Sequence, residues 1–156
     1  MYDSAYIDYL AHLLGTRDYF ECHEILEEHW KKEIPLERDS IWVAFIQLAV
    51  ALYHHRRGNY LGGIRLIKKS QDKFHKHRDL IEANFGLQRQ SLFELLDEIQ
   101  EKIIQHKPYE SINLPINDAK LKALVQEKCK KWGCQFESKS NLNDEFLIHK
   151  HKLRER

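Results

Sequence analysis

Apolar side chains recur every three or four positions along most of the chain, which is the spacing of amphipathic helices. Residues 3–14 show it first, with an apolar stripe made of Tyr6, Ile7, Leu10, Leu13 and Leu14. The same period predicts further helices at about residues 19–32, 40–57, 60–77, 90–106 and 117–133. The pattern therefore predicts an all-α protein with five to six helices.

The helix at residues 40–57 differs from the others because it is apolar on almost all sides. Such a helix belongs in the centre of a domain rather than on its surface. Its apolar run, residues 41–53, contains Gln47 as the one polar residue and is too short to cross a bilayer. We therefore expect a soluble bundle around this helix and no membrane span.

The ends of the predicted helices carry the expected capping residues. Gly15 is suited to close the first helix in a left-handed conformation, and Thr16 or Asp18 to cap the second. Asp39 or Ser40, Asn59, and Asn117 or Asp118 precede the third, fourth and sixth helices, and Gly58 and Gly133 follow the third and sixth.

Two stretches about forty residues apart, "GTRDYFECHEIL" and "RGNYLGGIRLI", share a glycine, a polar cap, an aromatic residue and an amphipathic helix. Two consecutive αα-hairpins would produce this echo, and its end after two copies favours a compact bundle over a solenoid. We expect residues 1–133 to form a single helical domain. Residues 134–156 read as a C-terminal extension that is partly packed or mobile, with Phe146, Leu147 and Ile148 as its packing residues.

Composition and charge exclude several classes of protein. Apolar residues make up 42% of the chain and charged residues 31%, which is globular rather than disordered. The net charge of +1 hides an acidic first part, since residues 1–58 carry six Lys/Arg against ten Asp/Glu. This asymmetry suits a homo-oligomer or a protein partner, but the basic excess elsewhere is too small to predict nucleic-acid binding. Three cysteines without framework spacing, and no signal-peptide pattern, favour the cytoplasm.

The residues most suited to chemistry lie in "FECHEILEEHW", residues 20–30. His23 and Glu27 are four positions apart and share one face of the predicted helix. An imidazole and a carboxylate so placed suit a divalent metal, or a pair in which the carboxylate orients the imidazole. The plainer interpretation is a structural hydrogen bond. Both remain open, because two ligands alone hold a metal weakly.

The helix at residues 40–57 supplies candidate partners for this pair. Gln47 is polar within an apolar run, and His54 follows it by two turns on the same face. If the second and third helices pack antiparallel, the polar side chains of His23, Glu27, Gln47 and His54 converge. A buried hydrogen-bond network that fixes helix register is the alternative.

The motifs "FECHEILEEHWKKE" and "FIQLAVALYHHRRGNYLGGIRLI" resemble the bacterial and archaeal domain of unknown function 309 family. Its His-x-x-x-Glu-x-x-Trp motif is matched by His23, Glu27 and Trp30, and "RGN" is followed here by Gly62 and Gly63 rather than Gly-Ala. The resemblance covers about residues 19–69, within a family-like core of about residues 3–78. It implies an all-helical fold and a metal-binding role for the His/Glu motif, without a known function.

Three neighbouring residues are weaker candidates. Trp30 could line a pocket but is better suited to packing against the third helix. Arg56 and Arg57 end that helix and suit its dipole, and Arg57 is the candidate for receiving an anion at a pocket mouth.

Two functional hypotheses follow. In the first, His23, Glu27, Gln47 and His54 form a metal or small-ligand site, with no reaction class or substrate assigned. In the second, the chain is a non-catalytic interaction module and the cluster is scaffolding.

Overall fold

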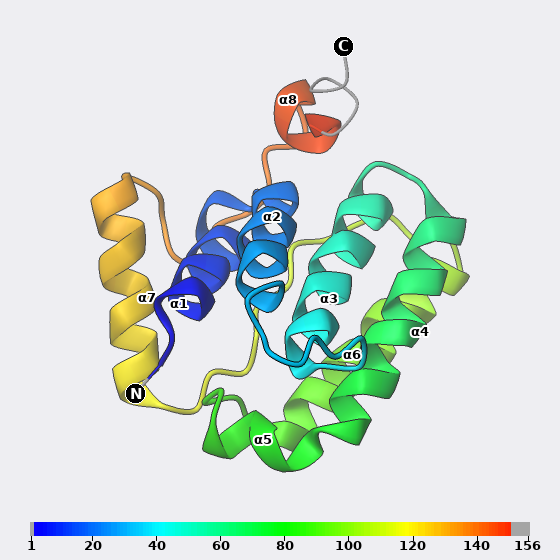
Figure 1. Ribbon diagram of the computed structural model, residues 1–156. Coiled ribbons are helices and arrows are strands. Elements are labelled where there is room, and N and C mark those ends of the chain that lie inside the picture. Colours follow the sequence, from blue (N-terminus) through cyan, green and yellow to red (C-terminus); the bar gives the residue numbers. More distant parts are fainter. Residues whose placement is uncertain (1, 151–156) are drawn as a thin grey trace.

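The computed structural model describes residues 2–150, and its regular structure in this range is helical (Figure 1). The elements are α1 Ser4–Ala11, η1 His12–Thr16, α2 Tyr19–Trp30, α3 Ile41–Arg56, α4 Tyr60–Lys76, α5 Arg78–Ala83, α6 Arg89–Ile104, α7 Ala119–Trp132 and α8 Glu145–Ile148. An isolated antiparallel bridge joins Leu87 to Ile116. The predicted all-α bundle is confirmed.

Helix α3 lies at the centre of the bundle, as its apolar surface predicts. It packs against α2 on one side and α4 on the other, α6 packs against α4, and α7 against α1 (Figure 1). Phe45 of α3 is fully buried and makes edge contacts with Tyr6, Tyr9 and Phe74. The hydroxyl of Tyr9 donates to the Phe45 carbonyl at 2.7 Å, which satisfies a polar group inside the core.

The end of the first helix differs from the prediction that Gly15 closes it. The chain passes from α1 into the π-helical turn η1, and Arg17 takes the left-handed conformation with φ 59°. Gly15 has another role, because a Cβ there would lie 2.7 Å from the Sγ of Cys129 and 2.9 Å from the Sγ of Cys134. The absence of a side chain at residue 15 lets the end of α7 pack against the first helix.

The other helix ends agree with the capping pattern. Asp18, Ser40, Asn59 and Asp118 accept backbone N–H bonds at the starts of α2, α3, α4 and α7. Gly133 ends α7 with φ 70°. The N-caps fix where the helices begin, and the N-cap of α4, Asn59, lies directly beside the end of α3.

Two short helices lie where the apolar period is weak. Helix α5 has six residues and α8 has four, and both are too short for a helical period of apolar residues to be recognised in the sequence. Residues 134–150 run back over the bundle, where Ser138 donates its N–H to the Leu14 carbonyl and Ile148 is buried. Residues 151–156, part of the predicted extension, lie outside the described residues.

Within residues 2–150, none of the helices has the length and apolar character needed to cross a membrane.

Candidate functional site

His23 and Glu27 contact each other directly on α2. The Nε2 of His23 lies 2.6 Å from the Glu27 Oε2, and the Lys31 Nζ lies 2.8 Å from the other carboxylate oxygen. The side chains of His23 and Glu27 are 29% and 32% exposed, so the pair is at the edge of the core rather than inside it. The pKa of Glu27 is lowered, chiefly because Lys31 donates to its carboxylate, and further by the charge of His23.

A cavity of about 150 Å³ lies between α2 and α3, and we call it the α2–α3 cavity. It brings together the histidines of the two sequence motifs, His23 and His54. Its remaining walls are mainly apolar and aromatic: Tyr19, Phe20, Val50 and Tyr53. The rings of Phe20 and Tyr53 contact each other edge to face, with centroids 6.2 Å apart.

The motif "RGNYLGG" positions His54. The Asn59 side chain accepts the N–H of Gly62 through Oδ1, so its Nδ2 faces His54 and donates to Nδ1 at 3.2 Å. A Cβ at residue 62 would lie 2.8 Å from that Nδ2 and 3.1 Å from the His54 Cδ2. Gly58, at φ 82°, supplies the left-handed residue between the two helices. The motif therefore holds the imidazole of His54 in a fixed place.

The predicted four-residue cluster comes together only in part. Glu27 bonds to His23 but lines a hollow on the outer side of α2, of about 440 Å³, together with Glu21, Glu24, Ile25, Glu28 and Lys31. Gln47 is part-buried and does not line the α2–α3 cavity. Its Oε1 is buried and has no hydrogen-bond partner among the described residues.

The two secondary candidates also lie outside the lining of the α2–α3 cavity. The Nε1 of Trp30 donates to the Glu37 carbonyl at 2.7 Å and so fixes the connection between α2 and α3. The guanidinium of Arg57 lies 5.8 Å from the ring centroid of Tyr53, which is a cavity wall. Arg57 is therefore near the cavity without entering it.

The metal hypothesis gains no support from this geometry. In residues 2–150 no group of three or more His, Cys, Asp and Glu side chains is arranged to hold a metal ion. The imidazole of His23 and the carboxylate of Glu27, the two candidate metal ligands on α2, instead bond to each other.

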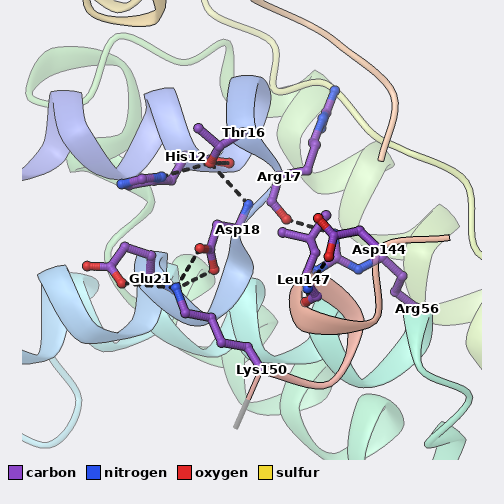
Figure 2. Close-up of polar contacts among 9 residues, drawn as sticks. All are labelled: His12, Thr16, Arg17, Asp18, Glu21, Arg56, Asp144, Leu147 and Lys150. Atoms are coloured by element: carbon purple, nitrogen blue, oxygen red, sulfur yellow. Dashed lines mark hydrogen bonds and ion pairs between the residues drawn. The ribbon is translucent and has the colours of Figure 1, made fainter. Parts of the chain in front are cut away.

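The sequence reasoning missed the extensive tertiary hydrogen bonds of two residues, Arg17 and Arg56. Figure 2 shows Arg56 reaching the Arg17 carbonyl, at 2.7 Å, and the Leu147 carbonyl, at 3.2 Å. Lys150 meets Asp18 and Glu21 at the start of α2 in the same view. Arg56 thus bonds to carbonyls of other segments and not only to the dipole of its own helix. The sequence contained one signal that Arg56 is buried, because Arg56 lies on the same face of α3 as Ala49 and Leu52.

Comparison with known proteins agrees with the family resemblance. The sequence model of the family described as "Domain of unknown function (DUF309)" matches residues 6–66. The chain is 47% identical over 156 residues to "Uncharacterized protein YpuF" of Bacillus subtilis (strain 168), covering 100% of this chain and 89% of that protein. No solved structure matches the chain. The chain therefore belongs to the DUF309 family.

Proposed function

We propose that the chain is a ligand-binding protein whose site is the α2–α3 cavity, and that its ligand places a small, mainly apolar ring there. One observation carries the proposal: two separate stretches of the sequence each contribute one imidazole to the same cavity, His23 from α2 and His54 from α3. Convergence of two separate motifs on one hollow is what a binding site requires.

The size and walls of the cavity define the ligand group. A volume of about 150 Å³ with apolar walls accepts a ring of about the size of benzene. The aromatic walls favour a planar ring, because aromatic pairs gain from edge and offset contacts. The ligand group is therefore a single ring rather than a nucleotide or a sugar chain.

His54 adds a polar edge to the cavity wall. Its Nδ1 accepts a hydrogen bond from Asn59, so a neutral imidazole carries its proton on Nε2. His23 has a different role, because its bond to Glu27 fixes the orientation of an imidazole that forms part of the cavity wall.

Ligand-observed NMR with pyridine and phenol as probes tests the proposal, together with the variant Val50→Phe, which fills the cavity. We expect both probes to bind the native chain at millimolar or lower concentration, and Val50→Phe to weaken them at least about tenfold, or about 1.4 kcal/mol. Val43→Phe is the matched control, since it adds the same ring to α3 at a part-buried position outside the cavity lining. Native binding by Val50→Phe, or no binding by the native chain, contradicts the proposal.

The alternative proposal is a non-catalytic interaction module in which the motif is scaffolding. It is favoured by the ladder of His23, Glu27 and Lys31, which are i,i+4 neighbours on a partly exposed helix face. Pairs of this kind contribute about 0.3–0.5 kcal/mol. Under this alternative, His23→Gln lowers the free energy of unfolding by an amount of that order, and the native chain binds neither probe.

A further inference from the structure

Arg17 and Arg56 are buried, and neither has a carboxylate partner among residues 2–150. Arg17 is 1% exposed and Arg56 is 8% exposed. Neither contributes to the ion pairs formed within residues 2–150. Arg17 bonds instead to the carbonyls of Leu13, Ile112 and Ser138, and Arg56 to that of Arg17. Because buried charge is normally compensated by opposite charge, this region carries an excess of positive potential.

Arg56 is also incompletely hydrogen-bonded. Its guanidinium stacks over the ring of Tyr19, with 4.3 Å from Cζ to the centroid, and its Nε is buried without a partner among the described residues. Its Nη1 donates to the Ser140 Oγ at 3.1 Å. The Ser140 hydroxyl therefore links the buried, positively charged guanidinium of Arg56 to groups outside the core.

A chain of hydroxyl groups runs to the same serine. The Tyr19 hydroxyl is buried and bonds to the Tyr109 hydroxyl, and Tyr109 in turn lies 2.8 Å from the Ser140 Oγ. Burial raises the pKa of Tyr19 far above its ordinary value, so Tyr19 keeps its proton. Among the described residues its only acceptor is Tyr109. Tyr109 in turn can donate to the Ser140 Oγ or to the Ser111 Oγ.

The two serines complete this network. Ser140 accepts a hydrogen bond from the Arg56 guanidinium, and its backbone N–H donates to the Ser111 Oγ at 2.9 Å. The Ser111 Oγ lies 3.4 Å from both the Ser140 Oγ and the Tyr109 hydroxyl. Hydroxyl groups rotate, so each serine can exchange a hydrogen bond within the network for one to a ligand.

Both serines line a pocket of about 310 Å³ between the segments before and after α7. Its other lining residues are Tyr109, Glu110, Lys139 and Leu142. The volume is at the lower end of the range for small-molecule sites. Glu110 is the one acid among the described lining residues, and its carboxylate is 76% exposed and lies 3.9 Å from the Lys102 Nζ. The pocket thus combines two serine hydroxyls with Lys139 and the buried charge of Arg56.

We propose that this pocket binds a phosphate group of a small molecule, with Ser111, Ser140 and Lys139 as direct donors and Arg56 as the charge behind Ser140. A phosphate brings several strong acceptor oxygens and negative charge, which match two serine hydroxyls beside Lys139 and Arg56. Among the described residues the pocket shares no lining residue with the α2–α3 cavity, so the two proposals stand or fall separately.

The test is a titration of the ¹⁵N-labelled full chain with sodium phosphate, followed by NMR at an ionic strength held constant with sodium chloride. We expect saturable shifts of the amides of residues 109–111 and 139–142, and none when chloride alone is varied. Lys139→Gln and Ser111→Ala should each weaken binding by about tenfold, the effect of one lost charge-assisted hydrogen bond. Methyl phosphate in a parallel titration separates the two sources of the group, since tighter binding than phosphate indicates an ester.

Lys130→Gln is the matched control, because it removes the same charge from an exposed position on α7 outside the pocket. It should bind phosphate as the native chain does. Equal weakening by Lys130→Gln and Lys139→Gln would mean that net charge alone is sensed and would overturn the proposal. Shifts that do not saturate, that lie elsewhere, or that acetate reproduces at the same concentration would also overturn it.

Discussion

The Asn59 side chain joins two helices, because its Oδ1 caps α4 while its Nδ2 donates to the Nδ1 of His54 at the end of α3. One amide therefore fixes both the start of a helix and the tautomer of a histidine in the α2–α3 cavity. The position is more demanding than an ordinary N-cap, where Asp and Asn serve almost equally well.

Replacing Asn59 separates these two tasks. Asn59→Ala loses the cap and should lower the free energy of unfolding by about 1 kcal/mol, measured by urea denaturation. Asn59→Asp keeps the cap but presents an acceptor to the His54 Nδ1, so His54 should carry a proton there. The ¹⁵N chemical shifts of the imidazole report this change. An unchanged Nδ1 in Asn59→Asp would show that the bond to Asn59 does not set the tautomer.

Gly62→Ala should destabilise the chain, although Ala is normally favoured over Gly inside a helix by about 1 kcal/mol. The new Cβ would lie 2.8 Å from the Asn59 Nδ2, so the cap and the bond to His54 must shift. We expect a lower free energy of unfolding by about 1 kcal/mol.

A double-mutant cycle identifies the cause. In the Asn59→Ala background the nearest obstructing atom is gone, so Gly62→Ala should be neutral or stabilising. Equal effects in both backgrounds would locate the strain elsewhere.

Stability should fall as the pH drops below about 6.5, because His12 and His55 are held neutral by the fold. Burial is the largest cause of the lowered pKa of each imidazole, and His55 also bonds through Nε2 to the Lys107 carbonyl. The unfolded chain then binds more protons than the folded chain, so stability is constant above the ordinary pKa and lost below it. The loss is at most about 1.4 kcal/mol per pH unit for each proton.

Urea denaturation at several pH values between 8 and 5 measures this slope. His55→Gln keeps a donor for the Lys107 carbonyl and should reduce the slope between pH 6.5 and 5. His75→Gln, on the exposed face of α4, is the matched control and should leave the slope nearly unchanged. A slope that His55→Gln does not alter would assign the effect to other groups.

Periodicity was enough to predict α3 as the centre of the fold and the facing positions of His23 and His54, because both depend on local geometry. It could not place Gln47. Seven residues span about 10 Å along a helix, so Gln47 shares a face with His54 but lies too far along α3 to line the same cavity. Two side chains of α3 can line one cavity only if they share a face of the helix and also lie at a similar position along the helix axis.

The features that sequence reasoning missed depend on contacts between distant segments. Arg17 closes the first helix in a left-handed conformation, although Gly15 is the residue with the intrinsic preference for it. The acceptors of its side chain include Ile112, Asn113 and Ser138, which the helical period says nothing about. Tertiary hydrogen bonds therefore decide the local conformation here.

Arg17→Lys tests whether this one side chain holds the C-terminal segment to the bundle. The guanidinium donates to three carbonyls and to the Asn113 Oδ1, and an ammonium cannot reproduce this planar fork. We expect a loss of about 3 kcal/mol in the free energy of unfolding, the cost of two hydrogen bonds to a charged group. Arg65→Lys, at an exposed position on α4, should change stability little.

Limited proteolysis separates a local effect from a global one. If Arg17 holds the segments on either side of α7 together, Arg17→Lys should speed cleavage within residues 134–144 more than cleavage within α3. The reason is that Arg17 bonds to Ser138 on one side and to Ile112 on the other. Equal acceleration at both places would mean that Arg17 stabilises the whole bundle, and the phosphate pocket between those segments would then depend on global folding rather than on this anchor.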